Sequence, residues 1–279
     1  MESLCVSGCQ TSILLELTSL ISTIIWREVA QAGTLTAYRE PLCRWVAADA
    51  PEFRELHRLV HPAHLMPHDL LPGARSVVSF FLPFAPWVVE ANARDREKVA
   101  HEWAVAYVET NSLIGRINAR LIESLAEHGI RAAAEPATHN FDPVTLLSRW
   151  SHKSVAVIAG LGSFGLHQMV ITDAGCAGRF GSLVLDADLP DLTPVSRERC
   201  LFFHDGSCLE CVQRCPVYAL DANRPLDKER CYHHLLTVAA QYQTVGIADV
   251  CGKCVLGPCS LCSAVEGLAS ETIDRGTGV

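Results

Sequence analysis

The chain has 279 residues, of which 49% are apolar, and its formal net charge is −8. This composition indicates a globular protein, and the acidic balance argues against a dominant nucleic-acid-binding surface, which is usually basic. No signal peptide is visible, and the apolar run 13–26 is too short and too polar to span a membrane. We therefore expect a cytoplasmic protein without a membrane partner.

The spacing of apolar residues predicts a mixture of helices and strands before residue 192. Helical spacing begins at residues 13–21 and continues in short pieces to about residue 70. Residues 76–82 predict a buried strand, and residues 91–127 predict a long helix pair or one interrupted helix that ends at Gly129. Short strands are expected at residues 131–134, 169–172 and 181–186, and a helix at residues 146–159. The elements predict an α+β fold.

After residue 192 the composition changes to cysteine-rich turns and short helices. Thirteen residues of the chain are cysteine, and nine of them fall between residues 200 and 262. In a reducing compartment, clustered cysteines usually bind metal and rarely form disulfides. We expect a first domain of residues 1–192, a small cysteine-rich domain of residues 193–265 and a polar tail of residues 266–279.

The strongest motif is a run of three cysteines, Cys208, Cys211 and Cys215, with a proline after the last. Bacterial ferredoxins use a similar run, in which the first cysteines hold one 4Fe-4S cluster and the last, turned away by the following proline, serves a second cluster. A second group with C-x2-C-x4-C spacing lies at residues 251–259, and Cys231 lies between the groups. This layout predicts two neighbouring 4Fe-4S clusters.

The run departs from the ferredoxin pattern at Asp205, where its first cysteine would fall. Cys200 is the natural substitute, although Asp205 leaves open an oxygen ligand or a three-cysteine cluster, and Cys262 could replace Cys259. Structural zinc is the alternative, because two C-x2-C pairs also suit that metal. The predicted ligands are Cys200, Cys208, Cys211 and Cys259 for the first cluster, and Cys215, Cys231, Cys251 and Cys254 for the second.

Four features follow one another in a recognisable order: LPGARSVVS at 71–79, AGLGSFG at 159–165, Gly181-Ser182, and the double cysteine group. Over about residues 70–262 this order resembles epoxyqueuosine reductase and its relatives, the reductive dehalogenases. The resemblance implies a cobalamin-binding domain with a nitroreductase-like α/β fold, followed by a ferredoxin-like module. Two 4Fe-4S clusters would pass electrons to the cobalt, with reduced ferredoxin or flavodoxin as the electron donor.

The glycine segment is a candidate for cofactor binding through Gly160, Gly162, Ser163 and Gly165. Glycines allow a large ligand to approach the backbone closely, and the segment is expected to open a helix whose N-terminal amides can hold a phosphate or amide oxygen. The alternative is tight packing between a helix and a strand with no ligand.

In the family that the sequence resembles, an aspartate shortly before the glycine segment donates a proton near the cobalt. Asp142 is the nearest candidate here, although it lies farther from the glycines than in the family pattern. His139 is a second candidate, because an imidazole titrates near neutral pH. For both residues the alternative is a side chain that caps a loop.

The main functional hypothesis is a cobalamin-dependent, iron-sulfur reductase. The alternative is an electron-transfer or corrinoid-handling protein without its own substrate chemistry, and a flavin is a third possibility because nitroreductase-like folds also hold flavins. Epoxyqueuosine reductases carry a further helical-repeat domain that helps hold tRNA, whereas this acidic chain ends soon after the second cysteine group. We therefore expect a small-molecule substrate or a corrinoid partner, and consider tRNA an improbable one.

Overall fold

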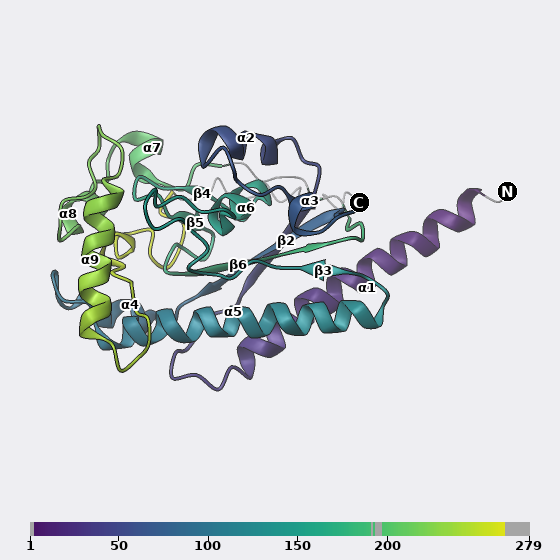
Figure 1. Cartoon of the computed structure of the whole chain (residues 1–279), viewed down its shortest axis with the longest axis horizontal. Coiled ribbons are helices and arrows are strands. Elements are labelled where there is room, and N and C mark those ends of the chain that lie inside the picture. Colours follow the sequence, from purple (N-terminus) through teal and green to yellow (C-terminus); the bar gives the residue numbers. More distant parts are fainter. Residues whose placement is uncertain (1–2, 191, 193–196, 266–279) are drawn as a thin grey trace, which may run out of the picture.

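A computed structural model describes residues 3–190, 192 and 197–265 (Figure 1). The centre of the molecule is an antiparallel sheet with strand order β1-β2-β6-β3, and a separate hairpin is formed by β4 and β5. The strands are β1 (Leu42–Ala47), β2 (Ser76–Pro83), β3 (Ala132–Ala133), β4 (Gly162–Phe164), β5 (Val170–Thr172) and β6 (Gly178–Leu185).

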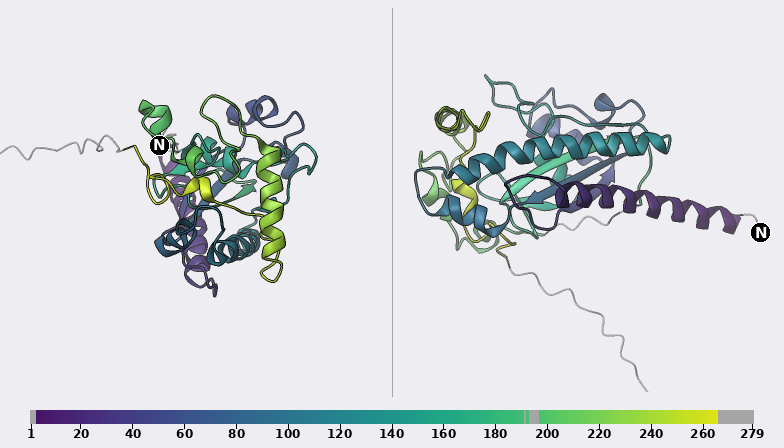
Figure 2. Two further views of the ribbon diagram at one scale, coloured as in Figure 1. Left: turned by 90° about the vertical axis from the view of Figure 1, so that its left-hand side faces the viewer. Right: turned by 90° about the horizontal axis from the view of Figure 1, so that it is seen from below.

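Helices cover both faces of the sheet. The two long helices, α1 and α5, lie side by side against one face, and the first turns of α1 extend beyond the sheet (Figures 1 and 2). Helix α6 packs against β2 and β6 on the other face, with α2 next to it. The helices of this part are α1 (Ser3–Ala30), α2 (Glu52–Leu59), α3 (Pro67–Leu70), α4 (Pro86–Ala93), α5 (His101–Glu127) and α6 (His152–Ile158).

Strand β2 explains the layered arrangement, because all eight of its residues are buried. Successive side chains of a strand point to opposite faces. Val78 and Phe80 join the cluster with α1 and α5, whereas Val77 packs with Trp150 on the opposite side. Burial of each such side chain stabilises the fold by about 1.5–3 kcal/mol. This mostly apolar strand is therefore covered on both faces.

The cysteine-rich part lies at one end of the sheet, on the left in Figure 1. Its cysteines share a hydrophobic cluster with Phe84 and Trp103 from the preceding part of the chain. The predicted domain boundary at residue 192 lies next to residues outside the described ranges, and the predicted tail, 266–279, lies wholly outside them. The elements are α7 (Leu201–Asp205), α8 (Glu210–Arg214), α9 (Lys228–Gln241) and the short 3-10 helix η1 (Lys253–Val255).

Most of the predicted elements are confirmed, with two corrections in the first 160 residues. The helix pair predicted over residues 91–127 is present as α4 and α5, although α4 begins at Pro86, and α5 ends just before Gly129, whose φ of 74° is the left-handed conformation typical of a helix end. The region to residue 70 is not wholly helical, because β1 forms the edge of the sheet. The helix predicted at 146–159 begins only at His152. No helix among the described residues is long and apolar enough to cross a membrane.

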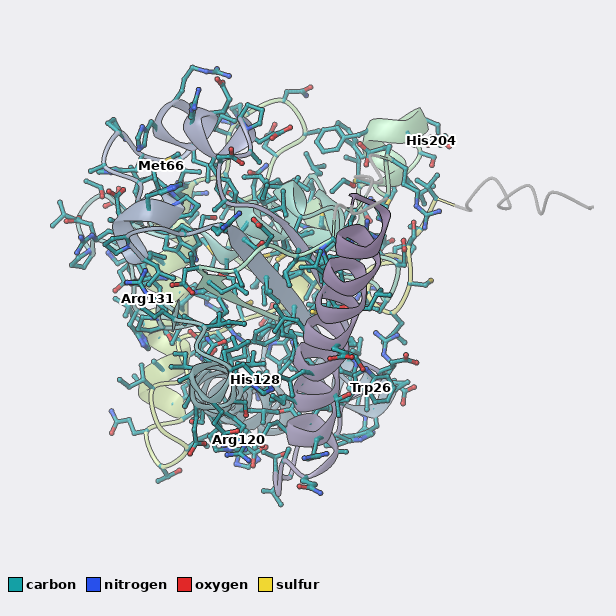
Figure 3. All side chains as sticks on the ribbon, turned by 90° about the vertical axis from the view of Figure 1, so that its right-hand side faces the viewer. Trp26, Met66, Arg120, His128, Arg131 and His204 are labelled. Carbon is teal, nitrogen blue, oxygen red and sulfur yellow. The ribbon has the colours of Figure 1, made fainter. Side chains whose placement is uncertain are left out.

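The outer side of the long helices carries exposed aromatic and charged groups. Figure 3 shows Trp26 near the end of α1, and Arg120 and His128 near the end of α5. Trp26 is 45% exposed, and Arg120 forms an ion pair with Glu123 one turn away. This side of the molecule therefore faces away from the buried cysteines.

Candidate functional site

The predicted metal ligands lie in one region of the molecule. Cys200, Cys211 and Cys215 belong to the hydrophobic cluster that contains Trp103, and Cys208 is half-buried nearby in sequence. All cysteines from Cys43 onward are free thiols. The remaining predicted ligands, which pack against the same cluster, are Cys231, Cys251, Cys254 and Cys259.

The four thiols that were predicted to hold the first cluster lie close enough for their charges to act on one another. Burial and the charges of three other thiolates together raise the pKa of Cys211 to about 12. Those three are Cys200, Cys259 and Cys208. Mutual repulsion of this kind requires short separations, because a like charge destabilises an anion only at close range.

The second predicted set shows the same behaviour. The pKa of Cys251 is raised to about 11, mainly by burial and in part by the charges of Cys231 and Cys215, against the opposing effect of Lys253. The pKa of Cys254 is raised well above its ordinary value by burial and then by Cys251 and Cys231. Buried thiols so close together are unfavourable as free anions, and a bound metal would remove that cost, because metal binding deprotonates its thiol ligands.

The glycine segment adopts a different local structure from the one expected. Gly160 has a φ of 78° and follows the last residues of α6, so it ends a helix and does not open one. A side chain on Gly162 would overlap with the carbonyl of Ile171 in the β4–β5 hairpin. These two glycines therefore serve chain reversal and close packing. The Oγ of Ser163 is buried without a hydrogen-bond partner.

A cavity of about 370 Å³ lies beside the second cysteine set. It is lined by all four cysteines of that set, Cys215, Cys231, Cys251 and Cys254, together with aromatic side chains from α5 and α9. Some buried polar atoms in its wall have no hydrogen-bond partner within the described chain. These are Trp103 Nε1, Arg179 Nε, His234 Nε2 and Asp249 Oδ1. Buried polar groups are nearly always paired, so this wall indicates a polar ligand.

A second cavity of about 430 Å³ adjoins the first and shares part of its lining, including Lys153, Arg179 and Tyr232. Burial lowers the pKa of both Lys153 and Arg179. The Arg179 guanidinium lies 4.3 Å from the ring centroid of Tyr107, and the charge of Asp249 partly opposes the effect of burial on the pKa of Arg179. The shared wall therefore carries two cations and aromatic surface.

His139 and Asp249 meet at these cavities. The His139 Nε2 lies 3.3 Å from an Asp249 carboxylate oxygen, and His139 has a φ of 57°, a left-handed conformation that is uncommon outside glycine. Nearby, the Tyr107 hydroxyl hydrogen-bonds to Thr138 at 2.9 Å, and burial raises the pKa of Tyr107. The site thus offers an imidazole, a carboxylate and a phenol beside the second cysteine set.

Asp142 lies on the same loop as His139 but does not line either cavity. Its carboxylate is exposed and accepts hydrogen bonds from the backbone amides of Val144 and Thr145, which lower its pKa. In this conformation Asp142 caps a turn, which is the alternative that the sequence left open for it. The residues that the sequence did not single out as site residues, Lys153, Arg179 and Asp249, carry no motif that could have identified them.

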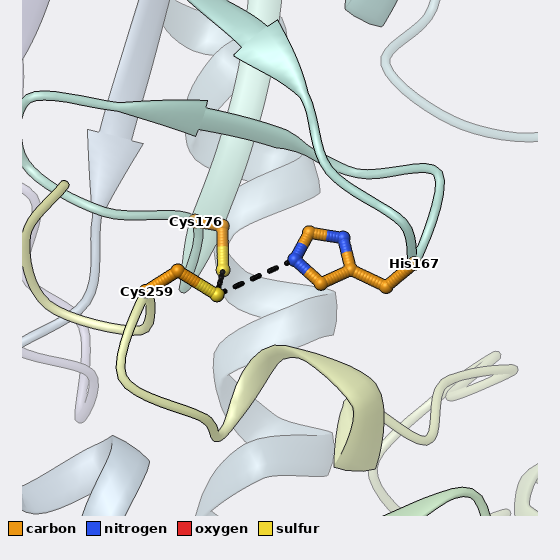
Figure 4. Close-up of side chains that lie close together, drawn as sticks. All are labelled: His167, Cys176 and Cys259. Atoms are coloured by element: carbon orange, nitrogen blue, oxygen red, sulfur yellow. Dashed lines mark hydrogen bonds between the residues drawn. The ribbon is translucent and has the colours of Figure 1, made fainter. Parts of the chain in front are cut away.

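Cys259 has two close neighbours outside the predicted ligand sets. Its Sγ lies 3.7 Å from the Sγ of Cys176 and 3.5 Å from the Nε2 of His167 (Figure 4). The hydrogen bonds from Cys176 and His167 lower the pKa of Cys259 to about 5, against the opposing effect of burial. The three side chains could also hold a metal ion, because their ligand atoms lie within 4.8 Å of one another.

The fold and site together define a class: a mixed α/β protein in which a cysteine-rich segment closes over a polar cavity. No protein-family model matches the chain. It is 30% identical over 171 residues to the epoxyqueuosine reductase of Salmonella typhimurium, a match that covers 61% of this chain and 41% of that enzyme. The chain is thus related by sequence to the epoxyqueuosine reductases, as its motifs predicted, but spans less than half the length of this relative.

Solved structures show the same relation at the level of the fold. Epoxyqueuosine reductase with a tRNA stem loop has a TM-score of 0.54 at 18% identity, over 88% of this chain and 66% of that one. The Bacillus subtilis enzyme, with its catalytic aspartate loop swung out of the active site, gives 0.54 at 18% identity, over 90% and 66%. A catabolic reductive dehalogenase with 3-bromo-4-hydroxybenzoic acid gives 0.54 at 16%, over 81% and 30%.

These relatives are oxidoreductases, in line with the enzyme class that the sequence predicted. The prediction that tRNA is an improbable partner finds no support, because one of the similar structures contains a tRNA stem loop.

Proposed function

We propose that the chain is an iron-sulfur reductase in which two 4Fe-4S clusters deliver electrons to a cobalamin and a substrate in the adjoining cavities. Residues 1–192 would form the nitroreductase-like domain and residues 193–265 the ferredoxin-like module. One observation carries the proposal: the second cysteine set lines the same cavity as a group of buried, unpartnered polar atoms. Electron transfer and ligand binding would then meet in one place.

The wall of the cavity suits a corrinoid in chemical character. A corrinoid carries many amide groups, which both donate and accept hydrogen bonds. Trp103 Nε1 and Arg179 Nε are donors without acceptors, and Asp249 Oδ1 is an acceptor without a donor. These three residues would hold the cofactor, which when bound would supply a strongly reducing metal centre. Shared lining with the second cavity leaves room for a substrate next to it.

The chain's own residues would supply the proton that a reduction needs. His139, held by Asp249, is the donor that the described conformation favours, because the pair borders the cavities. We retain Asp142 as a second donor that requires its loop to move. The Bacillus subtilis enzyme, whose catalytic aspartate loop is swung out of the active site in one structure, is a precedent for such movement.

For the substrate we propose a small molecule, with reduced ferredoxin or flavodoxin as the electron donor. Lys153 and Arg179 add positive charge beside the aromatic rings of Tyr107 and Tyr232. A tRNA stem loop containing epoxyqueuosine is the competing substrate, because an epoxyqueuosine reductase has been solved with one.

Anaerobic purification followed by metal analysis tests the proposal. Two clusters correspond to about eight iron atoms and eight acid-labile sulfides per chain. Added cobalamin should change its absorption spectrum on binding and should bind more weakly to Arg179→Met. Zinc without iron would contradict the electron-transfer role.

A turnover assay then separates the enzyme from a protein that only carries electrons. The loaded protein, with chemically reduced flavodoxin, would be given halogenated aromatics, oxidised nucleosides and the epoxyqueuosine stem loop in parallel. Reduction of a small molecule supports the proposal. Reduction of the stem loop alone would replace the proposed substrate, and full clusters with cobalamin but no reduction of any substrate would favour the electron-transfer or corrinoid-handling alternative.

A further inference from the structure

Cys176 and His167 lie close to Cys259, although both belong to the part of the chain before residue 192, far in sequence from the cysteine motifs. Cys176 lies just before β6, and His167 lies between β4 and β5 (Figure 4). Neither residue was among the predicted cluster ligands. Both side chains are buried, at 1% and 4% exposure, so the atoms near the Cys259 sulfur are shielded from water.

The backbone holds Cys176 against Cys259 independently of the side chains. The Cys176 N–H donates to the Cys259 carbonyl at 2.9 Å, and the Ala177 N–H donates to the Ser260 carbonyl at 3.0 Å. Gly175 permits this close approach, because a Cβ there would overlap with the Ser260 carbonyl and its φ is 80°. The placement of the Cys176 thiol is therefore fixed by two paired segments.

The tautomer of His167 follows from its second nitrogen. The Met169 backbone N–H donates to His167 Nδ1 at 3.0 Å, so Nδ1 has no hydrogen and the neutral ring carries its proton on Nε2. That Nε2 lies 3.5 Å from the Cys259 sulfur. His167 is thus oriented as a donor to Cys259. The Cys176 Sγ lies 3.7 Å from the same sulfur and 3.8 Å from the Val255 carbonyl, and a thiolate is the stronger acceptor of the two.

We propose that Cys176 and His167 are positioning residues that donate two hydrogen bonds to the Cys259 thiolate and thereby raise the reduction potential of the first 4Fe-4S cluster. The proposal rests on the proposed function in one respect, that Cys259 is a ligand of that cluster. Hydrogen bonds to the sulfurs are among the factors that set cluster potentials. Reduction adds negative charge to the cluster, so donors to its sulfur stabilise the reduced form more than the oxidised form.

Redox titration of the loaded protein, followed by electron paramagnetic resonance, tests this. The signal that disappears in Cys208→Ala identifies the first cluster. In a variant that combines Cys176→Ala with His167→Leu, we expect the reduced-to-oxidised ratio of that cluster at a fixed potential to fall about tenfold, which is 59 mV for a one-electron couple. The second cluster should keep its potential.

Conservative and matched variants separate hydrogen bonding from packing. Cys176→Ser and His167→Gln each retain a hydrogen-bond donor, so the potential of the first cluster should stay close to that of the unaltered protein. Cys43→Ala removes a thiol in β1 whose pKa reflects burial alone, and should leave both potentials unchanged. An unchanged first cluster in the double variant overturns the proposal, as does an equal shift in both clusters or loss of iron in His167→Leu, which would make His167 a ligand.

Iron and sulfide measured on the same samples distinguish a failure of the proposed function from a failure of the role proposed for Cys176 and His167. Absence of clusters from the unaltered protein contradicts the proposed function. Intact clusters whose potentials do not respond to either donor contradict only the role given to Cys176 and His167.

Discussion

The Nε2 of His139 and the Oδ2 of Asp249 lie 3.3 Å apart, although 110 residues separate them in the chain. His139 lies on the loop between β3 and α6, whereas Asp249 lies two residues before Cys251, the first cysteine of the second group. Asp249 is 9% exposed, and its other oxygen has no partner among the described residues. The pair therefore joins the two parts of the protein at the point where electrons would reach the ligand.

If His139 donates the proton, His139→Asn should lower turnover by about 100-fold, which is a typical contribution of general acid catalysis. Asp249→Asn should have a smaller effect, because it removes the orienting charge and leaves the acid in place. The measurement is substrate reduction at saturating electron donor, with iron content checked for each variant. His68→Asn, an exposed histidine on α3, is the matched control.

Asp142→Asn provides the competing test. Full activity in this variant, together with a large loss in His139→Asn, would assign the proton transfer to His139. The reverse result would mean that the loop carrying Asp142 moves into the cavity during turnover.

The assignment of the second cysteine set predicts a selective loss of metal. Cys231→Ala should remove about four iron atoms per chain and leave the first cluster, because Cys231 is near Cys215, Cys251 and Cys254. Iron analysis and the reduced-state paramagnetic spectrum measure this. Cys262→Ala, which alters an exposed thiol outside both sets, should retain all the iron. Loss of one cluster in Cys262→Ala would instead place Cys262 among the ligands.

Local spacing was sufficient to predict much of the cysteine arrangement. Thiols two or three residues apart in a tight loop converge on one point regardless of the rest of the fold, and the thiolates that raise the pKa of Cys211 and Cys251 belong to the same predicted sets. The assignment of these cysteines to two clusters stays a prediction. The buried strand β2 was predictable from local sequence too, since its residues are mostly apolar and β-branched or aromatic, with only Ser79 between Val78 and Phe80.

Long-range neighbours were not predictable from local pattern. The sequence of β1, which contains Arg44, shows no clear alternation of apolar and polar residues, so no strand was predicted there. It forms a strand because β2 supplies its hydrogen-bond partners. The glycine segment was expected to open a helix, but Gly160 ends α6 and Gly162 packs inside a hairpin. Asp249 shows the same limit, because its role depends on a loop that lies 110 residues away in the sequence.

Lys253 is a further contact between the two parts and predicts a stability effect. This lysine is 2% exposed, and its ammonium donates to the carbonyls of Asn92, Asp95 and Lys98 at 2.6–2.9 Å. Lys253→Met removes the donor that these three carbonyls share, so we expect the free energy of unfolding to fall by about 3 kcal/mol. Urea unfolding measures it, and Lys98→Met, on an exposed side chain, should change stability by less than about 0.5 kcal/mol. Equal stability of the two variants would contradict this role for Lys253.

His152 predicts how stability depends on pH. The ring is 7% exposed, with Nδ1 2.8 Å from the Ser182 hydroxyl and Nε2 2.9 Å from the Pro136 carbonyl. Burial lowers its pKa from 6.5 to about 4, so the folded protein holds it neutral while the unfolded chain takes up a proton below pH 6.5. Stability is then fully present above about pH 6.5, falls by about 3 kcal/mol between pH 6.5 and 4, and levels off below that.

Urea unfolding of the metal-free protein at several pH values measures this dependence, and His152→Gln should remove most of it between pH 6.5 and 4. Glutamine can still donate to the Pro136 carbonyl, so the variant is expected to fold at neutral pH with a loss of about 1 kcal/mol. His68→Gln, which changes an exposed ring, should keep the full pH dependence. A His152→Gln variant whose stability falls with acid as steeply as that of the unaltered protein would show that other groups, and not the buried imidazole, cause the acid sensitivity.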